Sequence, residues 1–163
     1  MRVNMDDPRL SLRPAVRTDR GAILNMVNAM ADTDKMPRLD PLTQERLILD
    51  AFDRKRVEFI FAEWEGKPIG YVAIFESYST FEARPTLFID DLFVLTEFRG
   101  RHAAYALFRY CIREAKRRDC GRVDWLVQEG NQPAFGFYDH LQAKRLKNWV
   151  PFRLTRDDIE KMG

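Results

Sequence analysis

Residues 86–95, which read TLFIDDLFVL, constrain the fold more than any other part of the chain. Large apolar side chains occupy both sets of alternating positions, so both faces of a strand formed here must be buried. A strand of that kind lies inside a sheet that other elements cover on both sides. The run therefore predicts a central strand in an α/β fold.

The hydrophobic period on either side of this run changes between that of a helix and that of a strand. Helical spacing predicts helices over residues 18–30, 43–52 and 133–141, with a further helix between Gly100 and Gly121 and a helical tail after Thr155. Short β-rich runs predict strands over residues 10–14, 57–64, 69–78, 122–128 and 149–154. The order indicates an α/β mixture with hairpins in its middle part.

Length and charge restrict the classes of protein that the chain can represent. Its 163 residues fit a single domain, and we expect residues 1–163 to form it. The 27 Lys and Arg residues and 25 Asp and Glu residues give a net charge of +2, too balanced to indicate a nucleic-acid-binding protein. No apolar run is long enough to span a membrane, and the N-terminus lacks the apolar core of a signal peptide.

The two cysteines, Cys111 and Cys120, match no zinc-binding spacing and cannot build a disulfide framework. A reducing environment is the default for such a chain, so we expect a cytoplasmic protein. From the cysteine spacing, the balanced charge and the lack of a long apolar run, we also expect no metal and no nucleic-acid or membrane partner. Neither His102 nor His140 lies at a metal-ligand spacing, and both are expected to be surface or structural residues.

A glycine-containing turn, EFRGRHAA at residues 97–104, connects the central strand to the next helix. The N-terminus of a helix presents unpaired N–H groups and the positive end of the helix dipole, and therefore suits a phosphate group. Taken alone, the segment is equally compatible with a solvent-exposed turn that carries two arginines.

Asp90 and Asp91 interrupt the apolar central strand. Because successive strand residues point to opposite faces, we expect one carboxylate on each face of the sheet. A buried, ionised carboxylate is costly without a partner, so such residues are paired, neutralised or functional. We expect one of the two to be structural and the other to line a cleft.

A third informative segment is NQPAFGFY at residues 131–138. Asn131 is a candidate helix N-cap and Pro133 suits the first turn of a helix. Tyr138 lies within this short helix, and its spacing alone favours a packing role over a catalytic one.

In combination, these segments resemble the GNAT superfamily of N-acetyltransferases, in particular the spermidine/spermine acetyltransferase branch and its bacterial relatives. The resemblance extends from about residue 12 to about residue 161. It is densest at LFIDDLFV (87–94), FRG (98–100) and the pattern N-x-P-A-x-x-F-Y (131–138). It implies a mixed, mostly antiparallel central sheet with helices on both faces, in which the parallel strands 88–95 and 122–128 splay apart.

The same resemblance implies that acetyl-CoA binds in the gap between the splayed strands. The turn would bind the pyrophosphate and the strand backbone would pair with the pantetheine arm. The cofactor-binding residues that it implies are Leu92, Phe93, Val94, Arg99, Gly100, Arg101, His102, Ala103, Ala104, Asn131 and Tyr138. The family usually has glycine in place of His102, but a histidine can keep helical dihedral angles, so we expect the turn to survive.

The implied reaction is direct attack of a primary amine on the thioester in a ternary complex. Asp90 is the implied general base, acting through ordered water, and Tyr138 the implied proton donor to the leaving thiolate. The acceptor would be a small molecule: a polyamine, a diamine or an amino-acid-like amine. The residues expected to contact it are Asp90, Asp91, Phe81, Glu82 and Trp149.

Two other functions remain open from the sequence. The departure at His102 favours an inactive relative that binds acyl-CoA as a sensor or interaction module, and a weaker alternative is an acetyltransferase for protein lysines or N-termini. We also expect a homodimer, because the strand predicted over 149–154 is apolar on both faces and comes last in the chain. Related acetyltransferases dimerise through their C-terminal halves.

Overall fold

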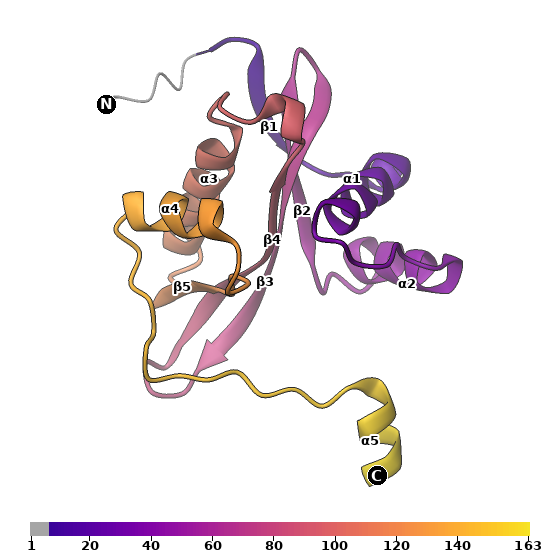
Figure 1. The fold of residues 1–163 in the computed structure, drawn as a ribbon, viewed down its shortest axis with the longest axis vertical. Helices are drawn as coiled ribbons and strands as arrows, with labels where there is room; N and C mark the ends of the chain where they lie inside the picture. Colours follow the sequence, from indigo (N-terminus) through magenta and orange to yellow (C-terminus); the bar gives the residue numbers. More distant parts are fainter. Residues whose placement is uncertain (1–6) are drawn as a thin grey trace. The chain divides into compact units, whose positions relative to one another are not determined.

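A five-stranded sheet in the order β1-β2-β3-β4-β5 organises the larger of two compact units of the computed structural model (Figure 1). The structure describes residues 7–163. The units are Met1–Leu126, which contains the sheet, and Val127–Gly163, and each is described by itself. No helix within the described residues is both long and apolar enough to cross a membrane.

Four strands of the sheet are antiparallel, and β4 and β5 run parallel to each other. The strands are β1 (Leu10–Pro14), β2 (Glu58–Trp64), β3 (Lys67–Ser79), β4 (Arg84–Val94) and β5 (Arg122–Trp125). The mixed sheet with one parallel pair confirms the expected fold class. Strand β5 ends at Trp125, three residues before the predicted boundary at 128, and its pairing with β4 stops at the same point.

The hairpin between β2 and β3 has a two-residue connection, Glu65 and Gly66. Both residues have positive φ angles, 50° and 76°. Two successive positive φ angles are typical of the type I′ turn, whose twist matches that of the strands on either side. The turn fixes Trp64 opposite Lys67 at this end of the sheet.

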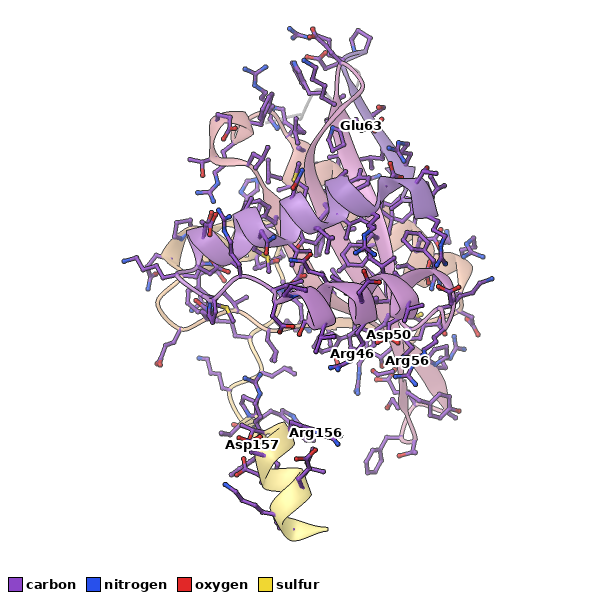
Figure 2. The ribbon with its side chains drawn as sticks, turned by 90° about the vertical axis from the view of Figure 1, so that its right-hand side faces the viewer. Arg46, Asp50, Arg56, Glu63, Arg156 and Asp157 are labelled. Carbon is purple, nitrogen blue, oxygen red and sulfur yellow. The ribbon has the colours of Figure 1, made fainter. Side chains whose placement is uncertain are left out.

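Helices cover both faces of the sheet. Helices α1 (Arg20–Thr33) and α2 (Pro41–Phe52) lie side by side on one face, as Figures 1 and 2 show, and α3 (Ala103–Arg117) lies on the other. Two short 3₁₀ helices, η1 (Arg17–Asp19) and η2 (Thr96–Phe98), precede α1 and α3. This two-sided cover is the arrangement that the apolar central strand predicted.

Local sequence signals explain where α2 begins. Asp40 caps the helix, because its carboxylate accepts hydrogen bonds from the backbone N–H and the hydroxyl of Thr43 at 3.0 and 2.6 Å. Pro41 follows in the first turn, where its missing N–H costs nothing. Towards the other end of α2, Figure 2 labels Asp50 and Arg56, whose charged groups lie 3.8 Å apart.

The core between the sheet and the α1–α2 pair is aromatic and aliphatic. Ile23, Met26 and Ile48 pack against Phe61 and Tyr71 of the sheet, and all five side chains are buried. On the opposite face α3 contributes its buried apolar stripe, which includes Leu107 and Cys111. Burial raises the pKa of the Cys111 thiol to about 12, which agrees with a core role for this cysteine.

The smaller unit contains two helices, α4 (Gln132–His140) and α5 (Arg156–Met162). The strand predicted over 149–154 does not form, which corrects that expectation. Trp149 and Phe152 are 76% and 97% exposed, and Pro151 between them has no N–H to donate to a neighbouring strand. The predicted helical tail is confirmed as α5, which Thr155 caps by accepting from the N–H of Asp158.

Candidate active site

A β-bulge in β4 places the two aspartates of the central strand. Ala73 of β3 lies opposite Asp91, whereas the next residue, Ile74, lies opposite Ile89, so Asp90 has no partner in β3. An extra residue of this kind interrupts the alternation of side chains along the strand. Asp90 and Asp91 therefore point into the same pocket, which corrects the expectation of one carboxylate on each face.

This pocket, of about 270 Å³, lies under α1 and α2. Its walls are mostly apolar and come from both helices, the segment between them, β2, β3 and β4. Besides the two aspartates, the lining residues are Val27, Leu39, Thr43, Leu47, Val57, Phe59, Ala73 and Phe75. No lysine, arginine or histidine of the described chain is among them, so the two carboxylates have no cationic partner in the pocket.

The hydroxyl of Tyr71 holds Asp91 in place. It donates a hydrogen bond of 3.0 Å to Oδ2 of Asp91, and the tyrosine side chain is fully buried. Burial raises the pKa of Asp91 to about 6, with a further contribution from the negative charge of Asp90. The same surroundings raise the pKa of Tyr71, which therefore remains a proton donor. Burial also raises the pKa of Asp90, although this residue is more exposed than Asp91.

Beyond the bulge, β4 has a free edge. Pairing with β5 ends at Ile89 and Trp125, and β4 continues to Val94. Among the described residues no strand pairs with this outer edge. Backbone groups alternate between the two edges of a strand, so those of Leu92 and Val94 are available to an extended ligand, whereas those of Phe93 face β3. The parallel pair that the sequence resemblance implied is confirmed, and its pairing stops at Ile89 and Trp125.

The turn after β4 leads into α3 through two residues with positive φ. Gly100 has φ 80°, and His102, the N-cap of α3, has φ 62° and ψ 7°. The expectation that His102 keeps helical dihedral angles is therefore wrong, although the turn does form. A left-handed conformation costs a residue other than glycine about 1–2 kcal/mol. A glycine at this position would avoid that cost.

The first turn of α3 keeps its N–H groups free for an anion. The side chain of His102 makes no capping hydrogen bond, and the first intrahelical bond runs from the N–H of Ala106 to the carbonyl of His102. The N–H groups of the residues between them, which include Ala103 and Ala104, precede that bond. Within residues 7–163, no carboxylate forms an ion pair with Arg99 or Arg101.

His102 also lines a second, half-open pocket of about 260 Å³. Leu10 and Leu12 of β1 and Ala106 and Arg113 of α3 form the rest of its lining. In the described chain, no group of three or more His, Cys, Asp or Glu residues is placed to hold a metal ion.

Asn131 and Tyr138 belong to the smaller unit, where the structure gives their local setting. Asn131 caps α4, as predicted, because its side-chain oxygen accepts a hydrogen bond of 3.2 Å from the N–H of Ala134. The ring of Tyr138 makes an edge-to-face contact with Phe137, with centroids 5.1 Å apart. Their roles towards acetyl-CoA stay predictions.

Phe81 and Glu82, which were predicted to contact the acceptor, are not among the lining residues of the carboxylate pocket. Phe81 is fully exposed at the tip of the β3–β4 hairpin. At the same tip the carboxylate of Glu82 lies against Gly121 and 3.8 Å from Arg122, which gives Glu82 a structural partner at the start of β5. Trp149 belongs to the exposed segment of the smaller unit.

Sequence reasoning did not identify Tyr71 or the apolar walls of the pocket. Tyr71 lies in a run of apolar strand residues, and nothing in its spacing indicates that its hydroxyl meets Asp91 across the sheet. The contact depends on the register of β3 and β4, which the bulge shifts by one residue.

The model of the acetyltransferase (GNAT) family matches residues 24–142 of the chain. Among curated proteins, an L-ornithine N5-acetyltransferase of Arabidopsis thaliana is 31% identical over 91 residues, 56% of this chain and 40% of that protein. A thialysine N-epsilon-acetyltransferase of Mus musculus is 23% identical over 93% of this chain and 96% of its own length.

The likeness among solved structures concerns the fold. An integron cassette protein from the mobile metagenome of V. cholerae superposes with a TM-score of 0.80 at 16% sequence identity. The match covers 94% of this chain and 97% of that one.

Proposed function

The chain belongs to the acetyltransferase (GNAT) family and is an acetyl-transferring enzyme, and we propose that it transfers the acetyl group of acetyl-CoA to a primary amine of a small linear diamine. The observation that carries this proposal is the pair of carboxylates, Asp90 and Asp91, in one apolar-walled pocket without a cation. Two negative charges and mostly apolar walls are complementary to two ammonium groups on a hydrocarbon stem.

The two carboxylates have different roles in this proposal. Asp91 is oriented by Tyr71, so it binds the ammonium group that does not react. Asp90 makes no side-chain hydrogen bond within the described chain and takes the proton from the reacting ammonium group through ordered water. This proton must leave before the nitrogen can attack, because an alkylammonium has a pKa near ~10.

The donor half of the site is supported by the free edge of β4 and by the start of α3. Acetyl-CoA supplies the acetyl group as a thioester. The backbone of Leu92 and Val94 pairs with the pantetheine arm, and one strand N–H stabilises the negative charge that develops on the carbonyl oxygen. The N–H groups after His102, together with Arg99 and Arg101, bind the pyrophosphate.

The names of the relatives suggest a second class of acceptor. Ornithine and thialysine are amino acids with a terminal amine, and each also has an α-carboxylate. In this chain a carboxylate would meet Asp90 and Asp91 with no basic residue among the lining. Like charges in a partly desolvated pocket repel, so diamines are favoured over diamino acids.

An assay of thiol release from acetyl-CoA with a matched set of amines tests the proposal. The set comprises 1,4-diaminobutane, 1,5-diaminopentane, L-ornithine, thialysine and the monoamine n-pentylamine. We expect the highest kcat/KM with a diamine and a lower value with n-pentylamine, which lacks the second charge. A higher value for ornithine or thialysine would reassign the acceptor. Binding of acetyl-CoA without turnover of any amine would favour the sensor instead.

A further inference from the structure

The guanidinium groups of two arginines lie over the indole ring of Trp64, at the end of β2. The guanidinium carbon of Arg9 lies 4.5 Å from the ring centroid and that of Arg101 lies 4.6 Å from it. Arg101 also lies 5.3 Å from the ring centroid of Phe98, in η2. The hairpin between β2 and β3 is thus in direct contact with the turn that leads into α3.

The two arginines differ in how their charge is compensated. Arg9 forms a two-pronged ion pair with Asp7, with N–O distances of 2.8 and 3.0 Å, and this pairing lowers the pKa of Asp7 to about 2. Arg101 forms no ion pair with a carboxylate within residues 7–163. Asp7 also interacts electrostatically with Arg101, but within the described residues it forms its ion pair with Arg9, so the N–H donors of Arg101 are available to an anion.

Stacking and anion binding use different parts of a guanidinium group. An aromatic ring attracts its face, whereas its N–H donors lie in the plane and point outwards from the edge. Contacts with Trp64 and Phe98 restrict the rotamers of Arg101, and within residues 7–163 its donors form no ion pair. A side chain that is ordered before binding loses less conformational entropy when it binds a phosphate.

We propose that Trp64 is a positioning residue, which holds Arg101 ready to bind a phosphate group of acetyl-CoA. This inference rests on the proposed function, in which the turn after β4 binds that part of the donor. Trp64 itself is fixed by its neighbours, because it pairs with Leu10 of β1 and with Lys67 across the tight turn of the hairpin. It acts on the donor through Arg101 and makes no contact with the acceptor.

Titration calorimetry with acetyl-CoA tests the proposal on Trp64→Leu, Trp64→Phe and the wild type. A cation–π contact contributes about 0.5–2 kcal/mol, so Trp64→Leu should raise Kd about 2- to 30-fold, and Trp64→Phe should restore part of the loss. Tyr78→Leu is the matched control, because it removes an exposed aromatic ring at the opposite end of β3. It should leave Kd unchanged, and thermal melting curves should show that all variants are folded.

Two further measurements separate positioning from a general structural effect. S-acetylpantetheine has no phosphate, so kcat/KM for this donor should be the same in Trp64→Leu and the wild type. In an Arg101→Ala background, Trp64→Leu should cause no further loss of acetyl-CoA affinity.

The alternative results identify which idea fails. Equal affinities of wild type and Trp64→Leu for acetyl-CoA would overturn the role of Trp64 and leave the proposed function intact. If Trp64→Leu lowered kcat/KM equally for acetyl-CoA and S-acetylpantetheine, the role of Trp64 would also be overturned. A wild-type protein that does not bind acetyl-CoA would overturn the proposed function and this inference together.

Discussion

The hydroxyl of Tyr71 and the carboxylate of Asp91 meet across two neighbouring strands at 3.0 Å, in a pocket that also contains Asp90. The hydrogen bond favours the ionised form of Asp91, whereas burial and the second carboxylate oppose it more strongly, so the pKa of Asp91 rises to about 6. At neutral pH the pocket therefore holds a charge that the fold itself does not compensate. A cationic ligand can compensate it.

Asp91→Asn should stabilise the protein at high pH and have little effect at low pH. The pKa of Asp91 is higher in the folded state than the ordinary value of 3.8, so protonated Asp91 contributes to the stability of the fold. This contribution to the free energy of unfolding is complete below about pH 4 and is lost as the pH rises through about 6. Above that pH, the raised pKa of Asp91 lowers the free energy of unfolding of the wild type by at most about 3 kcal/mol. Thermal unfolding between pH 4 and pH 8 measures the difference. If the melting temperatures of variant and wild type changed with pH in parallel, this prediction would be contradicted.

Asp90→Asn should reduce kcat about 10²- to 10⁴-fold, the usual contribution of a positioned general base, with a smaller change in KM for the amine. Asp91→Asn should show the opposite pattern, with KM raised more than kcat is lowered, because it removes a binding charge. Steady-state kinetics with a diamine compares the two variants. The assignment of roles fails if both variants change the same parameter.

His102→Gly should raise the melting temperature, because glycine adopts φ 62° without the cost that histidine has there. The gain is about 1 kcal/mol, or about 2–4 °C for a chain of this size. His102→Ala keeps the left-handed strain and is the matched control. Affinity for acetyl-CoA should be unchanged or improved in His102→Gly, and a large loss would instead identify the imidazole as a phosphate ligand.

Tyr138→Phe should lower kcat more than it weakens binding of acetyl-CoA, as expected from the match between Tyr138 and the tyrosine of the family. Rate measurements across the pH range, together with calorimetry, test this. Phe137→Leu, which removes the ring that Tyr138 contacts, controls for a packing effect. An unchanged kcat at every pH would leave Tyr138 a packing role.

The protein should form a homodimer through the exposed segment 149–154. Val150 and Phe152 are 73% and 97% exposed, and a run of exposed apolar side chains is usually covered by a partner. Light scattering at micromolar concentration should give twice the mass of one chain, and Phe152→Asp should reduce it. The mass of a single chain at every concentration would rule out the dimer.

Several features follow from the sequence because they depend on neighbours along the chain. The double-sided apolar pattern of residues 86–95 required cover on both faces, and α1, α2 and α3 provide it. The spacing of apolar residues located these helices, and Asn131 was correctly identified as a cap from its place before Pro133. Helix periodicity and capping are local properties, which a single sequence records directly.

Other features depended on contacts between segments far apart in the sequence. The alternation rule placed Asp90 and Asp91 on opposite faces, and only the register of β4 against β3 shows the bulge that brings both into one pocket. The left-handed conformation of His102 depends on the path of the turn between strand and helix, and residues 149–154 pair with no strand of the described chain. Strand register and turn path are set by tertiary packing, so no local pattern in the sequence indicates them.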